Sequence, residues 1–126
     1  MGLSERNPGT TSWRPISAEE RAVFGAILRA PGVRCSDEVL ADLDIALVAH
    51  GTTWILDVRM PTAVAVFDYP DGPLPVRAFV NKDSGYQGEI IVWITDGRIS
   101  GLEFAWVTDD PPRRWPRPTD MEFEAL

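Results

Sequence analysis

Two hydrophobic alternations that meet at an Asp-Gly step constrain the fold more than any other feature. Residues 88–108 read GEIIVWITDGRISGLEFAWVT, with Asp96 and Gly97 between two runs of aliphatic, β-branched and aromatic side chains. Asp-Gly between such runs is a strong signal for a two-residue hairpin turn. We therefore expect two long antiparallel strands here, and the remainder of the chain covers their apolar face.

The pairing register of this hairpin requires a bulge. A two-residue turn pairs Ile94 with Ile99. Continued without a break, the same register sets Ile90 opposite Glu103 and buries the carboxylate. One extra residue at Ser100-Gly101 moves every later side chain by one and removes the conflict. The core face is then Ile90, Val92, Ile94, Ile99, Leu102, Phe104 and Trp106, and the far face is Ile91, Trp93, Glu103, Ala105 and Val107.

An N-terminal helix is predicted by its cap and by its apolar stripe. Ser17 is followed three residues later by Glu20, which is the spacing of a capping box. The apolar side chains that follow recur with the period of a helix: Val23, Phe24, Ile27, Leu28 and Ala30. Pro31-Gly32 ends the helix, and the stripe can cover one face of a sheet.

Shorter patterns predict the segments that follow. Residues 36–43 form either a short second helix or a loop, since Ser36 or Asp37 can cap a helix there. From residue 45 the hydrophobic period changes to 2, so residues 45–50 and 54–60 predict a second hairpin.

The middle and the end of the chain add further strands. The β-branched and aromatic run 63–69 predicts one strand, and the alternation 76–80 predicts another. Residues 81–88 are polar and Gly-rich and predict a loop. Residues 121–126 form either a short edge strand or a loose end.

Length and composition predict one domain. The chain has 126 residues, of which 44% are apolar, enough for one core and too few for two. We expect a flexible N-terminal arm at 1–15 and a single α+β domain at 16–126. Its N-terminal helix packs on an antiparallel sheet of about five or six strands. Prolines keep 109–120 extended, with Trp115 anchoring it.

Charge and cysteine content limit the partners and the compartment. The formal net charge is −7, from 19 acidic and 12 basic residues, which disfavours nucleic acid and anionic lipid. The single cysteine excludes an internal disulfide and a Cys-cluster metal site. No signal peptide and no membrane-length apolar run are visible, so we expect a cytoplasmic protein that takes no metal and no cofactor.

The residues offer little for catalysis. His50 is the only histidine and follows a strand at a hairpin tip, so any Ser-His or Cys-His dyad depends on it. Cys35 has no local activating motif. The acidic pairs Asp42 with Asp44, and Asp109 with Asp110, are neighbours along the chain rather than converging groups. We assign no catalytic residue.

A binding surface is the better candidate. Ile91, Trp93, Glu103 and Val107 lie opposite the core face of the hairpin, and an exposed aromatic strip on a sheet marks an interface. The alternative is that the arm or a second layer covers them. Trp115 completes the candidate set. The cations Arg113, Arg114 and Arg117 around it can contact a nucleic acid, but the net charge favours a solvated tail.

The C-terminal third carries a structural motif, a DG-x-I-x-x-LEF hairpin followed by D-x-x-P-x-x-x-P. Its positions are Asp96, Gly97, Ile99, Leu102, Glu103 and Phe104, then Asp109, Pro112 and Pro116. In this it resembles a type of small uncharacterised bacterial protein found in GC-rich genomes. The resemblance implies an α+β architecture and carries over no activity.

The sequence therefore predicts a small, acidic, non-enzymatic binding protein. It is either a homodimer or a module for a protein partner, and neutralising a basic toxin-like partner, as an immunity protein does, is one version. The alternative is a small-molecule binder or minor enzyme. Its pocket would lie between helix and sheet and be lined by Trp54, Trp106 and Asp57.

Overall fold

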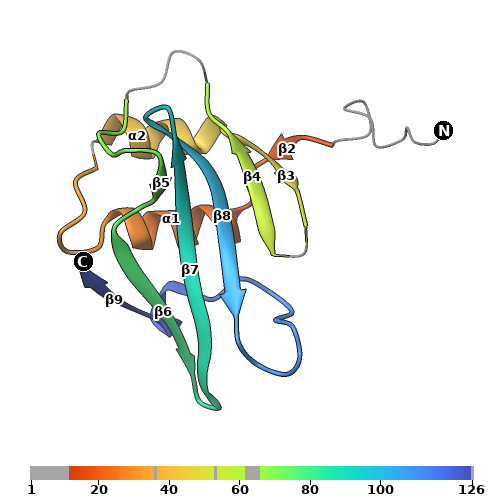
Figure 1. Ribbon diagram of the computed structural model, residues 1–126. Coiled ribbons are helices and arrows are strands. Elements are labelled where there is room, and N and C mark those ends of the chain that lie inside the picture. The colour runs from red at the N-terminus through yellow and green to blue at the C-terminus, as the bar shows by residue number, and fades with distance from the viewer. Residues whose placement is uncertain (1–11, 36, 53, 62–65, 126) are drawn as a thin grey trace.

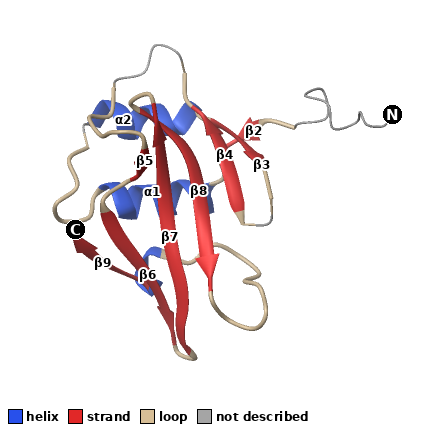
Figure 2. Cartoon of the chain, in the orientation of Figure 1, coloured by secondary structure: helices blue, strands red, loops and turns tan. Residues whose placement is uncertain are grey.

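The chain folds into two layers, an antiparallel sheet with helices packed on one of its faces (Figures 1 and 2). The computed structural model describes residues 12–35, 37–52, 54–61 and 66–125. Its helical elements are α1 (Ala18–Leu28), α2 (Asp37–Asp42) and the 3-10 turns η2 (Leu43–Ile45) and η3 (Pro118–Asp120). Its strands are β2 (Arg14–Pro15), β3 (Leu47–His50), β4 (Ile55–Arg59), β5 (Gly72–Pro73), β6 (Val76–Lys82), β7 (Gly85–Thr95), β8 (Arg98–Trp106) and β9 (Met121–Ala125).

The predicted α+β architecture is confirmed, with more strands than expected. The described strands form one eight-stranded sheet in the order β2-β3-β4-β8-β7-β6-β9, and β5 pairs with β7 beside that path. The count exceeds five or six partly because β2 and β5 are only two residues long. Such short strands carry no alternation that a sequence pattern can reveal.

The β7–β8 hairpin has the predicted turn and the predicted bulge. Asp96 and Gly97 have φ values of 53° and 71°, as a type I′ turn requires. Ile94 pairs with Ile99 and Trp93 pairs with Gly101, so Ser100 is the extra residue. Six of the seven predicted core side chains are at most 3% exposed: Ile90, Val92, Ile94, Ile99, Leu102 and Phe104.

The prediction that Trp106 is buried in the core is wrong. Its side chain is 37% exposed, because β8 ends there, below the part of the sheet that α1 crosses (Figure 1). It pairs with Gly88, which has no side chain to pack beside the indole. The alternation therefore assigned the correct face, but that face is not covered at the end of the strand.

Helix α1 begins and packs as its sequence predicts. The Ser17 hydroxyl accepts a hydrogen bond from the Glu20 backbone N–H at 3.1 Å, and the Glu20 carboxylate accepts one from the Ser17 N–H at 2.9 Å. The predicted stripe, Val23, Phe24, Ile27, Leu28 and Ala30, is buried against the sheet. The second helix also forms as α2 and brings Val39 into the same core.

Two segments differ from the prediction. Residues 66–69, the described part of the run 63–69, form no strand, although Phe67 is buried. Residues 81–88 are not a loop, because β6 continues to Lys82 and β7 begins at Gly85. Backbone pairing between long strands outweighs the polar composition there. Of the two alternatives for the C-terminus, the edge strand forms as β9, paired with β6.

The described parts of the two predicted flanking segments contact the body of the domain. Residues 1–11 of the predicted arm lie outside the described residues, but Arg14–Pro15 pair with β3. The Arg14 guanidinium donates to both oxygens of Glu20, at 2.9 and 2.6 Å. Trp115, in the proline-rich segment, is 5% exposed and packs edge-on against Trp54, with ring centroids 5.2 Å apart.

Candidate functional site

None of the helices that the structure describes packs on the second face of the sheet. Both α1 and α2 contribute to the single core on the other face, behind β7 and β8 in Figure 1. Across β4, β8 and β7, the register sets Ile55, Glu103 and Ile91 side by side on the uncovered side, and each is half-buried. We call this side the open face. It consists of the strand residues whose neighbours along the chain point into the core.

Trp93 lies at the centre of the open face on a surface that the bulge creates. Its partner on β8 is Gly101, and a Cβ added there would lie 3.5 Å from the Trp93 Cβ and Cδ1 atoms. The indole therefore rests over a residue with no side chain. Its Nε1–H donates a hydrogen bond of 3.1 Å to Glu103 Oε1. These contacts hold a half-exposed aromatic ring in a defined orientation.

A groove of about 440 Å³ lies beside Ile91 and extends to Pro73, which pairs with Trp93. It lies where β5 and β6 pair with different parts of β7 and leave the sheet locally open. Its lining residues are Pro73, Leu74, Pro75, Val76, Arg77, Glu89, Ile90 and Ile91. The two prolines at its rim have fixed φ angles, so they lose little conformational freedom when a ligand binds.

An ion pair forms the polar edge of this groove. The Arg77 guanidinium donates to both oxygens of Glu89, at 3.2 and 2.6 Å, and lies over the Phe79 ring, 4.7 Å from its centroid. The hydrogen bonds from Arg77 hold the pKa of the Glu89 carboxyl below its ordinary value. Glu89 is therefore charged at neutral pH, next to the apolar Ile91.

The open face is acidic. By the pairing register, its carboxylates are Asp57, Glu89, Glu103, Glu122 and Glu124, and its guanidiniums are Arg59, Arg77 and Arg98. Glu89 is already paired with Arg77, and Glu103 accepts a bond from an uncharged indole. The face thus combines an apolar centre with an excess of negative charge around it.

The structure brings together three of the five residues that the sequence selected for binding. Ile91, Trp93 and Glu103 are neighbours on the open face. Val107 follows the end of β8 and is 63% exposed. Trp115 packs in the core on the opposite side of the sheet. The groove at Pro73 and Arg77 has no local sequence signal, since it arises from the way β5 and β6 divide the edge of β7.

The residues of the alternative pocket do not surround one cavity. Trp54 packs against the rings of Phe104 and Trp115, with centroids 5.8 and 5.2 Å away. Asp57 is exposed on the open face, opposite Gly101. Trp106 is exposed at the end of β8. Beside Trp54, the interior between helix and sheet is filled by the rings of Phe104 and Trp115.

His50 and Cys35, the two potential partners of a catalytic dyad, have different surroundings. The exposed His50 has its Nε2 atom 3.3 Å from Arg14 Nη2. Cys35 is half-buried, and this burial raises the pKa of its thiol. Within the described ranges, no three His, Cys, Asp or Glu side chains are grouped so that they could hold a metal ion.

Among the residues that the structure describes, no helix combines the length and apolar character that crossing a bilayer requires. Comparison of the chain with protein-family models, curated proteins and solved structures finds no match. The geometry of the open face is therefore the basis for assigning a function.

Proposed function

We propose that this protein is a small non-enzymatic binding protein whose open face takes a basic protein partner. The observation that supports the proposal is the combination on this face of a fixed, half-exposed Trp93, a groove beside Ile91 and surrounding carboxylates. Aromatic residues near the centre of an interface, with a polar rim, are the usual arrangement of energetically important contacts.

Charge favours a basic partner over a second copy of the chain. The whole protein carries a formal charge of −7, and the open face contributes five carboxylates against three guanidiniums. Two such faces would repel each other, whereas a basic surface is attracted and guided into encounter. Neutralisation of a basic toxin-like partner, as an immunity protein does, is one concrete form of this activity.

The groove indicates how such a partner would be held. An apolar side chain of the partner can enter between Pro73 and Ile91, and its flanking cations can contact Glu103 and Asp57, which is exposed. The Arg77–Glu89 pair borders the groove and holds the Arg77 guanidinium away from those carboxylates. Specificity would then come from the charges around the rim, and affinity from the Trp93 and Ile91 contacts.

Site-specific photocrosslinking tests this proposal. A benzophenone amino acid replaces Ile91 on the open face, and in a matched control it replaces Ala22, which is exposed on α1. After irradiation in the native host, we expect a basic protein to be crosslinked from position 91 only. Asp57→Lys should reduce that product. Identical products from both positions, or none from position 91, would contradict the proposal.

The homodimer alternative has a separate test. Size-exclusion chromatography with light scattering on wild type and Trp93→Ala reports the mass of each. The basic-partner proposal predicts a monomer for both variants. A wild-type dimer that Trp93→Ala dissociates would instead show that a second copy occupies the open face.

A further inference from the structure

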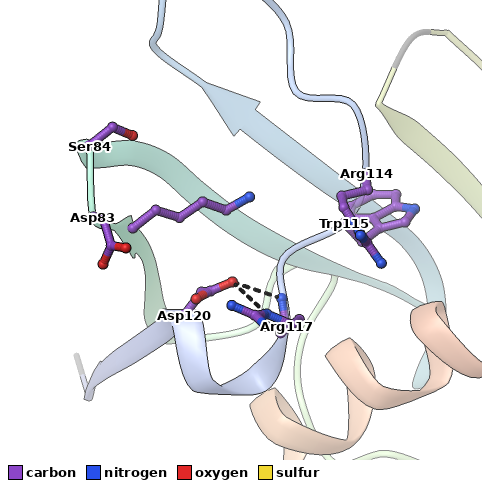
Figure 3. A pocket seen from close by; sticks show the side chains of 7 residues that line it. Asp83, Ser84, Arg114, Trp115, Arg117 and Asp120 are labelled. Carbon is purple, nitrogen blue, oxygen red and sulfur yellow. Dashed lines mark hydrogen bonds and ion pairs between the residues drawn. The ribbon is translucent and has the colours of Figure 1, made fainter.

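A second cleft lies on another side of the molecule, between the β6–β7 turn and the proline-rich segment (Figure 3). Its volume is about 420 Å³, within the range of small-ligand sites. Its lining residues are Lys82, Asp83, Ser84, Arg114, Trp115, Arg117 and Asp120. Three of the seven are cationic, in a chain whose net charge is −7.

The cations reach the cleft from two distant parts of the sequence. Lys82 ends β6, whereas Arg114 and Arg117 flank the buried Trp115 in the proline-rich segment. Figure 3 shows Arg114 and Arg117 across the cleft from the β6–β7 turn. Prolines on both sides of this segment and the anchored indole restrict its backbone, so the Cα positions of Arg114 and Arg117 are set before any ligand binds.

Each guanidinium is oriented by one carboxylate and keeps other N–H groups for a ligand. Arg114 donates through Nη2 to Glu19 Oε2 at 3.1 Å, and Glu19 also accepts from the Trp115 backbone N–H at 3.3 Å. Arg117 donates through Nε to Asp120 Oδ2 at 3.4 Å. Among the described residues, the Lys82 ammonium has no hydrogen-bond or ion-pair partner.

The carboxylates of the cleft are mostly committed to these contacts. Asp120, whose side chain is 14% exposed, also accepts from the Arg117 backbone N–H at 3.3 Å. Asp83 is exposed on the turn, away from Arg114 and Arg117 in Figure 3. The uncommitted N–H donors of Lys82, Arg114 and Arg117 therefore give one end of the cleft a positive character.

We propose that this cleft binds a phosphate-bearing anion. A tetrahedral dianion can accept hydrogen bonds from several directions, which matches an ammonium and two guanidiniums on different segments better than a planar carboxylate does. A neighbouring cleft of about 480 Å³ shares Lys82 and Arg114, and it adds Arg113 together with the carboxylates Asp109 and Asp110. The organic part of a phosphomonoester can extend into it. The Ser84 hydroxyl is a further lining donor.

Titration with inorganic phosphate, monitored by NMR on the uniformly labelled protein, tests the site. Ionic strength is held constant by replacing chloride, and phosphoserine and sulfate are titrated in parallel. We expect saturable shifts of the Trp115 indole and Lys82 amide signals, with a Kd on the order of millimolar. Tighter binding of phosphoserine than of inorganic phosphate would indicate a phosphomonoester as the ligand, and the reverse order would indicate the free ion.

Variants distinguish phosphate binding in this cleft from nonspecific attraction of the anion to positive charge. Lys82→Gln should weaken phosphate binding about ten-fold, because it removes one charge-assisted contact, whereas Lys82→Arg should retain it. Arg29→Gln also removes one positive charge, from an exposed position at the C-terminal end of α1, and should leave binding unchanged. The proposal fails if no saturable shift occurs, or if Lys82→Gln and Arg29→Gln weaken binding equally. Because neither Lys82 nor Arg29 is on the open face, neither result bears on the basic-partner proposal.

Discussion

Replacing two tryptophans one at a time gives a direct test of which face of the sheet is open. Trp115 is 5% exposed, and its ring contacts those of Trp54 and Phe104 at centroid distances of 5.2 and 6.3 Å. Removing a buried aromatic side chain costs about 3–5 kcal/mol. Trp93 is half-exposed, and its replacement by alanine removes one hydrogen bond, to Glu103, together with a partly buried ring. We expect Trp93→Ala to cost about 1 kcal/mol.

Urea denaturation followed by far-UV circular dichroism measures both costs. With a slope of about 2 kcal/mol per M, the midpoint falls by about 2 M for Trp115→Ala and by about 0.5 M for Trp93→Ala. Trp115→Phe keeps an aromatic ring and serves as the milder variant if Trp115→Ala does not fold. Equal midpoint shifts for the two alanine variants would contradict an open face at Trp93, because Trp93 would then be as well covered as a core residue.

Three further predictions concern stability. Glu20→Gln should lower the free energy of unfolding by about 2–3 kcal/mol, since it weakens the capping box and removes the ion-pair partner of Arg14. Glu19→Gln, at a more exposed carboxylate, should lower it by less than about 1 kcal/mol. Urea midpoints compare the two variants. Burial alone would raise the pKa of the Glu20 carboxyl, but hydrogen bonds from Arg14 and Ser17 hold it below its ordinary value. The contribution of the Glu20 carboxylate to the free energy of unfolding is therefore complete above about pH 4.3 and is lost as the pH falls through the folded-state pKa. The stabilities of wild type and Glu20→Gln should converge in acid. A stability difference that stays constant with pH would contradict this. Gly88→Ala should lower thermal stability far more than Gly72→Ala. Both glycines have positive φ, but only at Gly88 would the new Cβ collide with backbone, at the Ala105 carbonyl oxygen.

The open face was partly predictable. Alternation along the hairpin, together with the cost of burying Glu103, sets Ile91 and Trp93 on the far face. Whether that face is covered depends on where the helices pack, which no local pattern records. The groove at Pro73, the Arg77–Glu89 pair and the cleft at Lys82 join residues from separate segments, so they become visible only when the chain is folded.

The features that could be predicted from the sequence depend on interactions between residues that are close along the chain. The Ser17–Glu20 capping box and the Asp96-Gly97 turn need only residues within a few positions of each other, and the bulge at Ser100 follows from pairing two adjacent strands. Tertiary structure decided the rest. It buried Trp115 while exposing Trp106, and it extended β6 and β7 through a polar run. These outcomes depend on contacts between distant segments, whose free energy outweighs local preference.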